Sequence, residues 1–164
     1  MLRTVALLTP PFASLTYAVP EWLAGFAWCP GLRVAVPLGR GMLRIGVVLG
    51  DGSPLPEGVT ARPMLWPLEK EPLLPSGHME MVRQLALRQA VTPGQILAMV
   101  LPAGLRVTQM RLRTMEGQGK AQIRLLKDLP KLPAEVLSAL GEAWMQGGAE
   151  LLGPREDAAA SELC

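Results

Sequence analysis

The chain is short of the residue types from which metal, redox and membrane sites are usually built. It has one histidine and two cysteines, and aromatic side chains make up 4% of its 164 residues. A single histidine, His78, supplies no ligand set for a structural zinc site. Cys29 and Cys164 make no disulfide framework, so we expect a reduced, cytoplasmic protein with Cys29 as a buried thiol. No apolar stretch approaches the ~18 residues of a membrane span, so no membrane partner is expected.

The motifs of common enzymes are also missing. Residues 117–121 read Gly-Gln-Gly-Lys-Ala, but Thr114 stands where a phosphate-binding loop needs glycine and Ala121 where it needs Ser or Thr. We interpret this stretch as a basic β-turn. His78 has no Gly-x-Ser-x-Gly elbow to accompany it. The two glutamates flanking Lys70 are interpreted as a solvated charge run. The sequence therefore offers no catalytic constellation and no cofactor site.

The first informative feature is the distribution of charge, because basic and acidic residues are spread unevenly along the chain. Residues 1–50 hold four basic residues and one acidic residue, and residues 106–131 hold seven and two. Residues 132–164 reverse the balance, with one basic and six acidic residues. The basic blocks suit a phosphate-bearing partner, although solvated faces of either sign would give the same count.

The first part of the chain is predicted to be mainly β. Sixteen prolines and 17 glycines favour short strands and turns. Alternating apolar residues predict strands at 3–8, 15–19, 32–38 and 43–49. Gly39-Arg40-Gly41 has the composition of a tight hairpin turn between the last two of these. A proline-interrupted strand at 59–68 is expected at a sheet edge.

The hydrophobic period then changes to that of helices. Residues 77–90 predict a helix. Thr92 is a candidate N-cap, Pro93 suits the first helical position and Gln95 completes a capping box. These two helices would cover one opening or face of the strand layer. After a break near residue 103, residues 105–126 regain strand character, and a further helix is expected from Pro133 to Gly147.

Several motifs then resemble one known family in the same order. Residues 31–39 (Gly-Leu-Arg-Val-Ala-Val-Pro-Leu-Gly) resemble the family pattern Gly-x-Arg-Val-x-Val-Pro-Phe-Gly, and residues 44–48 (Arg-Ile-Gly-Val-Val) resemble Arg-Ile-Gly-x-Val-Val. Residues 71–74 (Glu-Pro-Leu-Leu) and 101–106 (Leu-Pro-Ala-Gly-Leu-Arg) follow. Over residues 1–106 the chain is similar to the N-terminal, 3′ DNA-end-binding region of primosomal protein N′, the PriA family of bacterial replication-restart helicases.

The resemblance implies an α+β, mainly β fold. Residues 1–105 would form a small β-barrel-like 3′ DNA-end-binding domain covered by two helices. Residues 106–164 would form a partial winged-helix-like DNA-binding unit with an acidic tail. The helicase core of the family, where ATP, magnesium and zinc would bind, is expected outside these residues, so no cofactor is expected within them.

The resemblance also implies a function. The first domain of the family recognises the 3′ end of the nascent leading strand at a stalled fork and orients the motor for primosome assembly. The implied pocket residues are Leu15, Thr16, Tyr17, Leu38 and Gly39. Leu15 stands where the family has an aromatic residue and Thr16 where it has an acidic one. A tyrosine on a strand is also a common core or sheet-surface residue, so the role of Tyr17 stays open at this stage.

The remaining expectations concern contacts and partners. Expected phosphate contacts are Arg33, Arg40, Arg44 and Arg62. Expected partners are forked or single-stranded DNA with a 3′ end, other primosome proteins, and single-stranded-DNA-binding protein through the helicase core. The alternative is a protein-interaction or scaffolding module whose DNA binding is weak and indifferent to strand ends.

Overall fold

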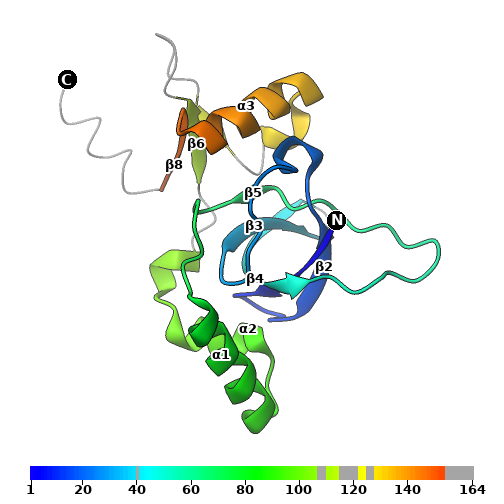
Figure 1. Ribbon diagram of the computed structural model, residues 1–164, viewed down its shortest axis with the longest axis vertical. Coiled ribbons are helices and arrows are strands. Elements are labelled where there is room, and N and C mark those ends of the chain that lie inside the picture. The colour runs from blue at the N-terminus through cyan, green and yellow to red at the C-terminus, as the bar shows by residue number, and fades with distance from the viewer. Residues whose placement is uncertain (40, 107–109, 115–121, 125–127, 154–164) are drawn as a thin grey trace, which may run out of the picture. The chain divides into compact units, whose positions relative to one another are not determined.

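The computed structural model describes residues 1–39, 41–106, 110–114, 122–124 and 128–153 (Figure 1). The chain divides into two compact units. The first contains Met1–Pro20 and Ala27–Arg106, and the second contains Glu21–Phe26 and Val107–Cys164. The described elements confirm an α+β fold with mainly strands. The short segment Glu21–Phe26 thus groups with residues far from it in the sequence.

One five-stranded antiparallel sheet forms the body of the first unit. The strand order is β2 (Ser14–Ala18), β1 (Leu2–Leu7), β4 (Met42–Asp51), β3 (Arg33–Leu38) and β5 (Trp66–Pro67). The first four strands lie within two residues of their predicted positions, because alternating apolar side chains set both their extent and their buried face. Trp66, Ile45 and Val34 are each at most 1% exposed and mark the core of this sheet.

The sheet does not close into a barrel, but the segment before β5 links its two sides. The Ala18 amide donates to the Arg62 carbonyl oxygen and the Met64 amide to the Ala18 carbonyl oxygen, each at 2.9 Å. The Leu65 amide donates to the Ala35 carbonyl oxygen of β3 at 2.8 Å. The predicted strand at 59–68 is therefore wrong for most of its length. Its prolines have no N–H for a continuous ladder, so only the two residues of β5 pair as a strand, at the edge.

Two helices follow the sheet, as predicted. Helix α1 spans Ser76–Gln89 and places His78 in its first turn, and α2 spans Pro93–Val100. The predicted capping box is present: the Gln95 amide donates to the Thr92 hydroxyl at 3.3 Å, and the Thr92 amide donates to the Gln95 side chain at 2.9 Å. The start of α2 is thus fixed by local hydrogen bonds.

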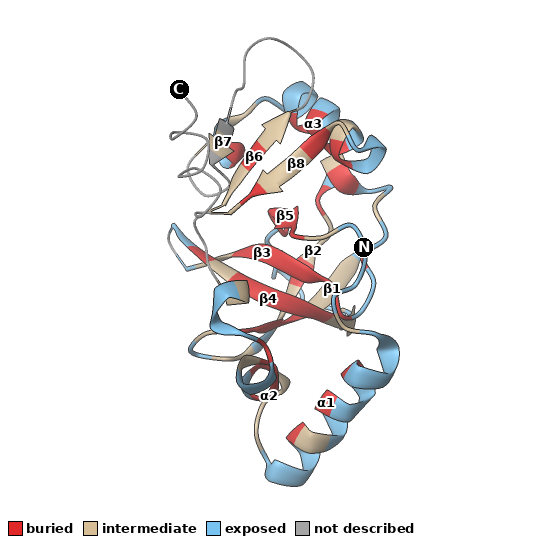
Figure 2. Ribbon diagram, turned by 90° about the vertical axis from the view of Figure 1, so that its left-hand side faces the viewer, coloured by how far each residue is buried: buried red, intermediate tan, exposed pale blue. Residues whose placement is uncertain are grey.

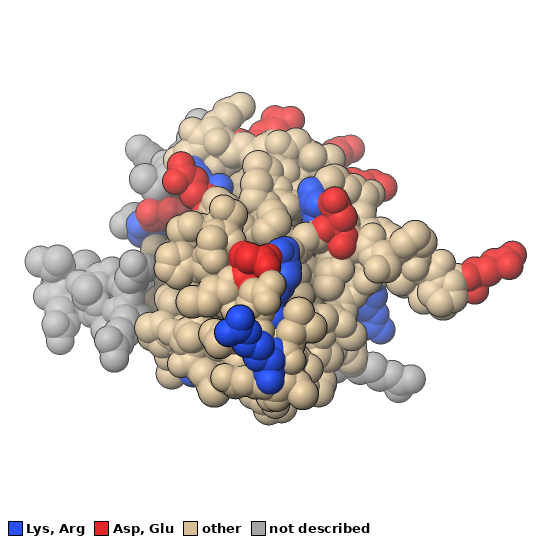
Figure 3. Space-filling view, turned by 60° about the horizontal axis from the view of Figure 1, so that its bottom comes forward, with Lys and Arg blue, Asp and Glu red and all other residues tan. Residues whose placement is uncertain are grey.

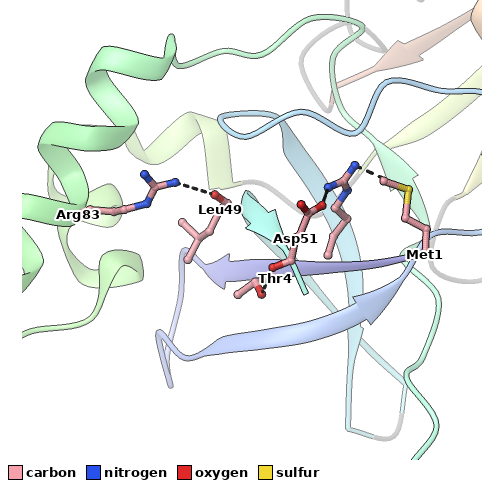
Figure 4. Close-up of polar contacts among 6 residues, drawn as sticks. Met1, Thr4, Leu49, Asp51 and Arg83 are labelled. Carbon is pink, nitrogen blue, oxygen red and sulfur yellow. Dashed lines mark hydrogen bonds and ion pairs between the residues drawn. The ribbon is translucent and has the colours of Figure 1, made fainter. Parts of the chain in front are cut away.

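The helices are attached to the sheet by close backbone contacts. A Cβ at Gly94 of α2 would lie 2.7 Å from the Phe12 carbonyl oxygen, so only glycine fits there. Arg83 of α1 donates to the carbonyl oxygen of Leu49 on β4 at 3.1 Å (Figure 4). Figure 2 shows that most of α1 is exposed, whereas β3 and β4 are largely buried.

A partly buried ion pair joins three parts of the first unit. Arg33 is 8% exposed, and its Nε donates to the Glu69 carboxylate at 2.5 Å. Its Nη1 donates to the Leu105 carbonyl oxygen at 2.6 Å, in the 3-10 turn Ala103–Arg106. Burial raises the pKa of Glu69, and the hydrogen bond and charge of Arg33 oppose this rise. The interpretation of Glu69 as part of a solvated charge run is therefore wrong, because the carboxylate turns inward to Arg33.

The second unit contains a three-stranded sheet and one helix. The strand order is β7 (Gln122–Arg124), β6 (Arg111–Thr114) and β8 (Ala149–Leu152). Helix α3 spans Ala134–Gln146 and ends at Gly147 in the left-handed conformation, as predicted. Two 3-10 turns, Glu21–Leu23 and Leu129–Lys131, complete the described part of the unit, and the first of them packs on α3. The predicted turn at 117–121 and the acidic tail from 154 lie outside the described residues.

One further expectation about a side chain is wrong. Cys29 is exposed rather than buried. It lies in the loop between the first 3-10 turn and β3, directly before Pro30, where no strand or helix carries its side chain into the core. Its apolar character alone therefore did not determine its burial.

The packing of Glu21–Leu23 on α3 predicts an unusual response to Gly141→Ala. A glycine-to-alanine change in a helix normally stabilises by about 0.4–1 kcal/mol. At Gly141 the new Cβ would meet the Trp22 carbonyl group, so we expect a destabilisation of about 1–3 kcal/mol in urea unfolding. Gly77→Ala on α1, with no neighbouring atom within 4 Å, is the matched control and is expected to stabilise. A stabilising Gly141→Ala would contradict this packing.

Removal of Arg33 is expected to act on stability. Arg33→Met leaves the Glu69 carboxylate partly buried without its cation, which is expected to lower the free energy of unfolding by about 3 kcal/mol. The double variant Arg33→Met, Glu69→Met removes both charges and should recover a large part of that loss. Urea unfolding of the three proteins measures both effects, and equal stability of wild type and Arg33→Met would refute the structural role of the pair.

Candidate nucleic-acid interface

A pocket of about 410 Å³ opens on the first unit. Its walls come from β2, from the end of β3 and from the segment that leads to β5. Its volume lies in the range of about 300–1,000 Å³ that is usual for ligand sites. The lining residues are Ser14, Leu15, Thr16, Tyr17, Pro37, Leu38, Gly39, Leu55, Val59, Thr60, Ala61 and Arg62. The structure thus brings together all five predicted pocket residues and one of the predicted phosphate-binding arginines.

Tyr17 forms a rigid part of the pocket wall. The side chain is 4% exposed, and its hydroxyl donates to the Pro37 carbonyl oxygen at 3.0 Å. Burial raises the pKa of Tyr17, and the charge of Arg62 partly opposes this. The hydroxyl therefore stays protonated at neutral pH and keeps its hydrogen bond between β2 and β3. Tyr17 is a core residue as well as a pocket residue, so both interpretations of the sequence describe part of its environment.

Gly39 and Arg62 form the polar rim of the pocket. Gly39 is exposed and has φ of +57°, a conformation that favours glycine. Its carbonyl oxygen accepts a hydrogen bond from Arg62 Nη1 at 2.5 Å. This bond ties the segment before β5 to the turn after β3. Arg40, the neighbouring predicted phosphate contact, lies outside the described residues.

The other two predicted phosphate contacts lie apart from the pocket lining. Arg44 on β4 is half-buried, and its Nη1 donates to the Leu43 carbonyl oxygen at 3.1 Å. Arg33 is buried in its pair with Glu69, and this geometry does not favour a phosphate contact. On the face drawn in Figure 3, basic side chains lie singly or beside acidic ones and do not form a continuous patch.

The chemistry of the pocket suits one small, partly polar group. Leu15, Leu38, Leu55 and Val59 offer apolar contact area, whereas hydroxyl groups and one guanidinium offer hydrogen bonds. Among the described residues there is no group of three His, Cys, Asp or Glu side chains that would hold a metal ion. No helix in the described part of the chain is long and apolar enough to cross a membrane.

Part of the lining was not predicted from the sequence. Leu55, Val59, Thr60 and Ala61 belong to a segment without regular structure before β5. Loop residues carry no periodic pattern that assigns them to a face. Val59, Thr60 and Ala61 were predicted within the strand at 59–68, and no pattern showed which surface this segment would cover.

Comparison with known proteins identifies the first unit. Residues 4–102 match the family model of the PriA 3′ DNA-binding domain (3′BD), which spans more than half of the chain. No curated protein matches the sequence. The matched model describes a DNA-binding domain. The pocket lies within the matched residues, as do β1 to β5 for all but the first two residues of β1. The chain therefore belongs to the PriA 3′ DNA-binding domain family, whose members bind DNA in replication restart.

Proposed function

We propose that the pocket receives the 3′-terminal nucleotide of a DNA strand. The observation that carries the proposal is the convergence of Leu15, Thr16, Tyr17, Leu38 and Gly39, which the family resemblance implied, on one pocket. The membership of the chain in a 3′ DNA-binding domain family supports the same ligand. In a replication-restart protein, the strand would be the nascent leading strand at a stalled fork. Its capture would orient a helicase motor for assembly with the other primosome proteins and single-stranded-DNA-binding protein.

The lining gives each part of a terminal nucleotide a counterpart. Leu15 and Leu38 provide apolar surface for the face of the base, in place of aromatic stacking. Gly39 has no side chain, so its backbone allows close approach of the sugar. Thr16 supplies a neutral hydroxyl for the edge of the base or the terminal sugar. Arg62 lies at the rim, where the last phosphate of the strand would pass.

Filling the pocket should abolish the preference for strand ends. Ala61→Trp places a large ring among the lining residues, whereas Ala103→Trp makes the same change at an exposed turn away from the pocket. In fluorescence-anisotropy titrations, we expect wild type and Ala103→Trp to bind a linear oligonucleotide more tightly than its circular form. Ala61→Trp should weaken linear binding about tenfold, or about 1.4 kcal/mol, and leave circular binding similar. Equal binding of linear and circular DNA by wild type would favour the scaffolding alternative.

The phosphate-contact proposal for Arg44 is tested by salt dependence. Each phosphate contact to single-stranded DNA contributes about 0.7 to the slope of log affinity against log salt. We expect Arg44→Gln to reduce that slope by about this amount. Arg88→Gln, on the exposed side of α1, removes the same charge and should leave the slope nearly unchanged. If both variants reduce the slope equally, Arg44 acts only through net charge.

A further inference from the structure

The pocket lining carries positive charge without a carboxylate to balance it. Among the described residues that line it, Arg62 is the only basic residue and none is acidic. The other polar side chains are the hydroxyl groups of Ser14, Thr16 and Thr60, and that of Tyr17, which already donates to the Pro37 carbonyl oxygen. A hydroxyl group can donate a hydrogen bond to an anion as readily as it accepts one. The lining is therefore suited to a group that bears negative charge.

Arg62 is positioned to bind such a group. It is exposed, and the bond from Nη1 to the Gly39 carbonyl oxygen fixes one side of its guanidinium. A guanidinium carries five N–H groups in a planar fork, so one bond leaves donors for a ligand. In the part of the chain that the structure describes, no carboxylate pairs with Arg62. Its charge is thus held at the rim without being neutralised.

We infer that the pocket binds a DNA strand that ends in a 3′-phosphate more tightly than one that ends in a free 3′-hydroxyl. The inference rests on the proposed function, because it assigns the chemistry of the same strand end. A phosphomonoester carries a charge of about −1.5 to −2 at neutral pH and offers three acceptor oxygens. A bond from Arg62 to such an oxygen is charge-assisted and about twice as strong as a bond between neutral groups. No carboxylate in the described lining opposes it.

The test compares two oligonucleotides of the same sequence and total charge. One carries its terminal phosphate on the 3′ end, and the other carries it on the 5′ end with a free 3′-hydroxyl. A circular oligonucleotide of the same sequence has no end. With the full 164-residue chain, we expect the 3′-phosphate strand to bind about threefold to tenfold more tightly than its isomer at low salt. Both linear strands should bind more tightly than the circle.

Two substitutions at Thr16 isolate the contribution of charge. Thr16 lies on the edge strand β2, half-buried in the pocket wall. Thr16→Asp introduces a carboxylate that would repel a terminal phosphate, so the preference should reverse toward the 3′-hydroxyl isomer. Thr16→Asn has nearly the same size as Thr16→Asp without the charge. Loss of the Thr16 hydroxyl contact should lower the affinity for both isomers in this variant, but it should not reverse their order. Circular dichroism of both variants verifies that they remain folded.

Three outcomes separate this inference from the proposed function. The expected order, with reversal only in Thr16→Asp, supports both. Linear strands that bind more tightly than the circle, with the 3′-hydroxyl isomer equal to or tighter than the 3′-phosphate isomer, overturn the inference and leave the proposed function standing. Linear and circular DNA bound alike by wild type would overturn both, because no strand end is then recognised.

Discussion

The hydrogen bonds of residues 62–65 hold the first unit in the form that its pocket requires. This segment bonds to Ala18 on β2 and to Ala35 on β3, two strands that are separated by β1 and β4 in the sheet order. The Tyr17 hydroxyl bonds across the same interval to the Pro37 carbonyl oxygen. A flat sheet of this order would keep β2 and β3 far apart. Because the segment joins them, side chains from both strands line one pocket.

The arginines of the first unit show why charge counts alone do not locate a binding surface. Arg33 and Arg62 both lie in the part of the chain that matches the DNA-binding family. Arg33 is paired with Glu69 and donates to the Leu105 carbonyl oxygen, so its charge is balanced by contacts within the protein. Arg62 is exposed at the pocket rim. Arg33 lies on β3 and Arg62 in the segment before β5, and the difference depends on a carboxylate 36 positions away in the sequence from Arg33.

The sequence predicted the features that local patterns control. Alternation located the first four strands, and Thr92, Pro93 and Gln95 located the start of α2 because a capping box is complete within four residues. The pocket residues on β2 and β3 followed from the family resemblance. The contribution of Leu55 to Arg62, the pairing of Glu69 and the exposure of Cys29 depend on contacts between distant segments, so no local pattern encodes them. Strand β8 is four residues long and carries too few positions to show a period.

The assignment of Glu21–Phe26 to the second unit has a consequence for how such a protein evolves. The polypeptide passes between the units after Pro20, after Phe26 and after Arg106. Genetic exchange that transferred residues 1–106 as a block would carry along a turn whose partner, α3, stays behind. Leu23, which is fully buried, would then be left on the surface of the recombinant. Selection against such chimaeras would keep the two units inherited together.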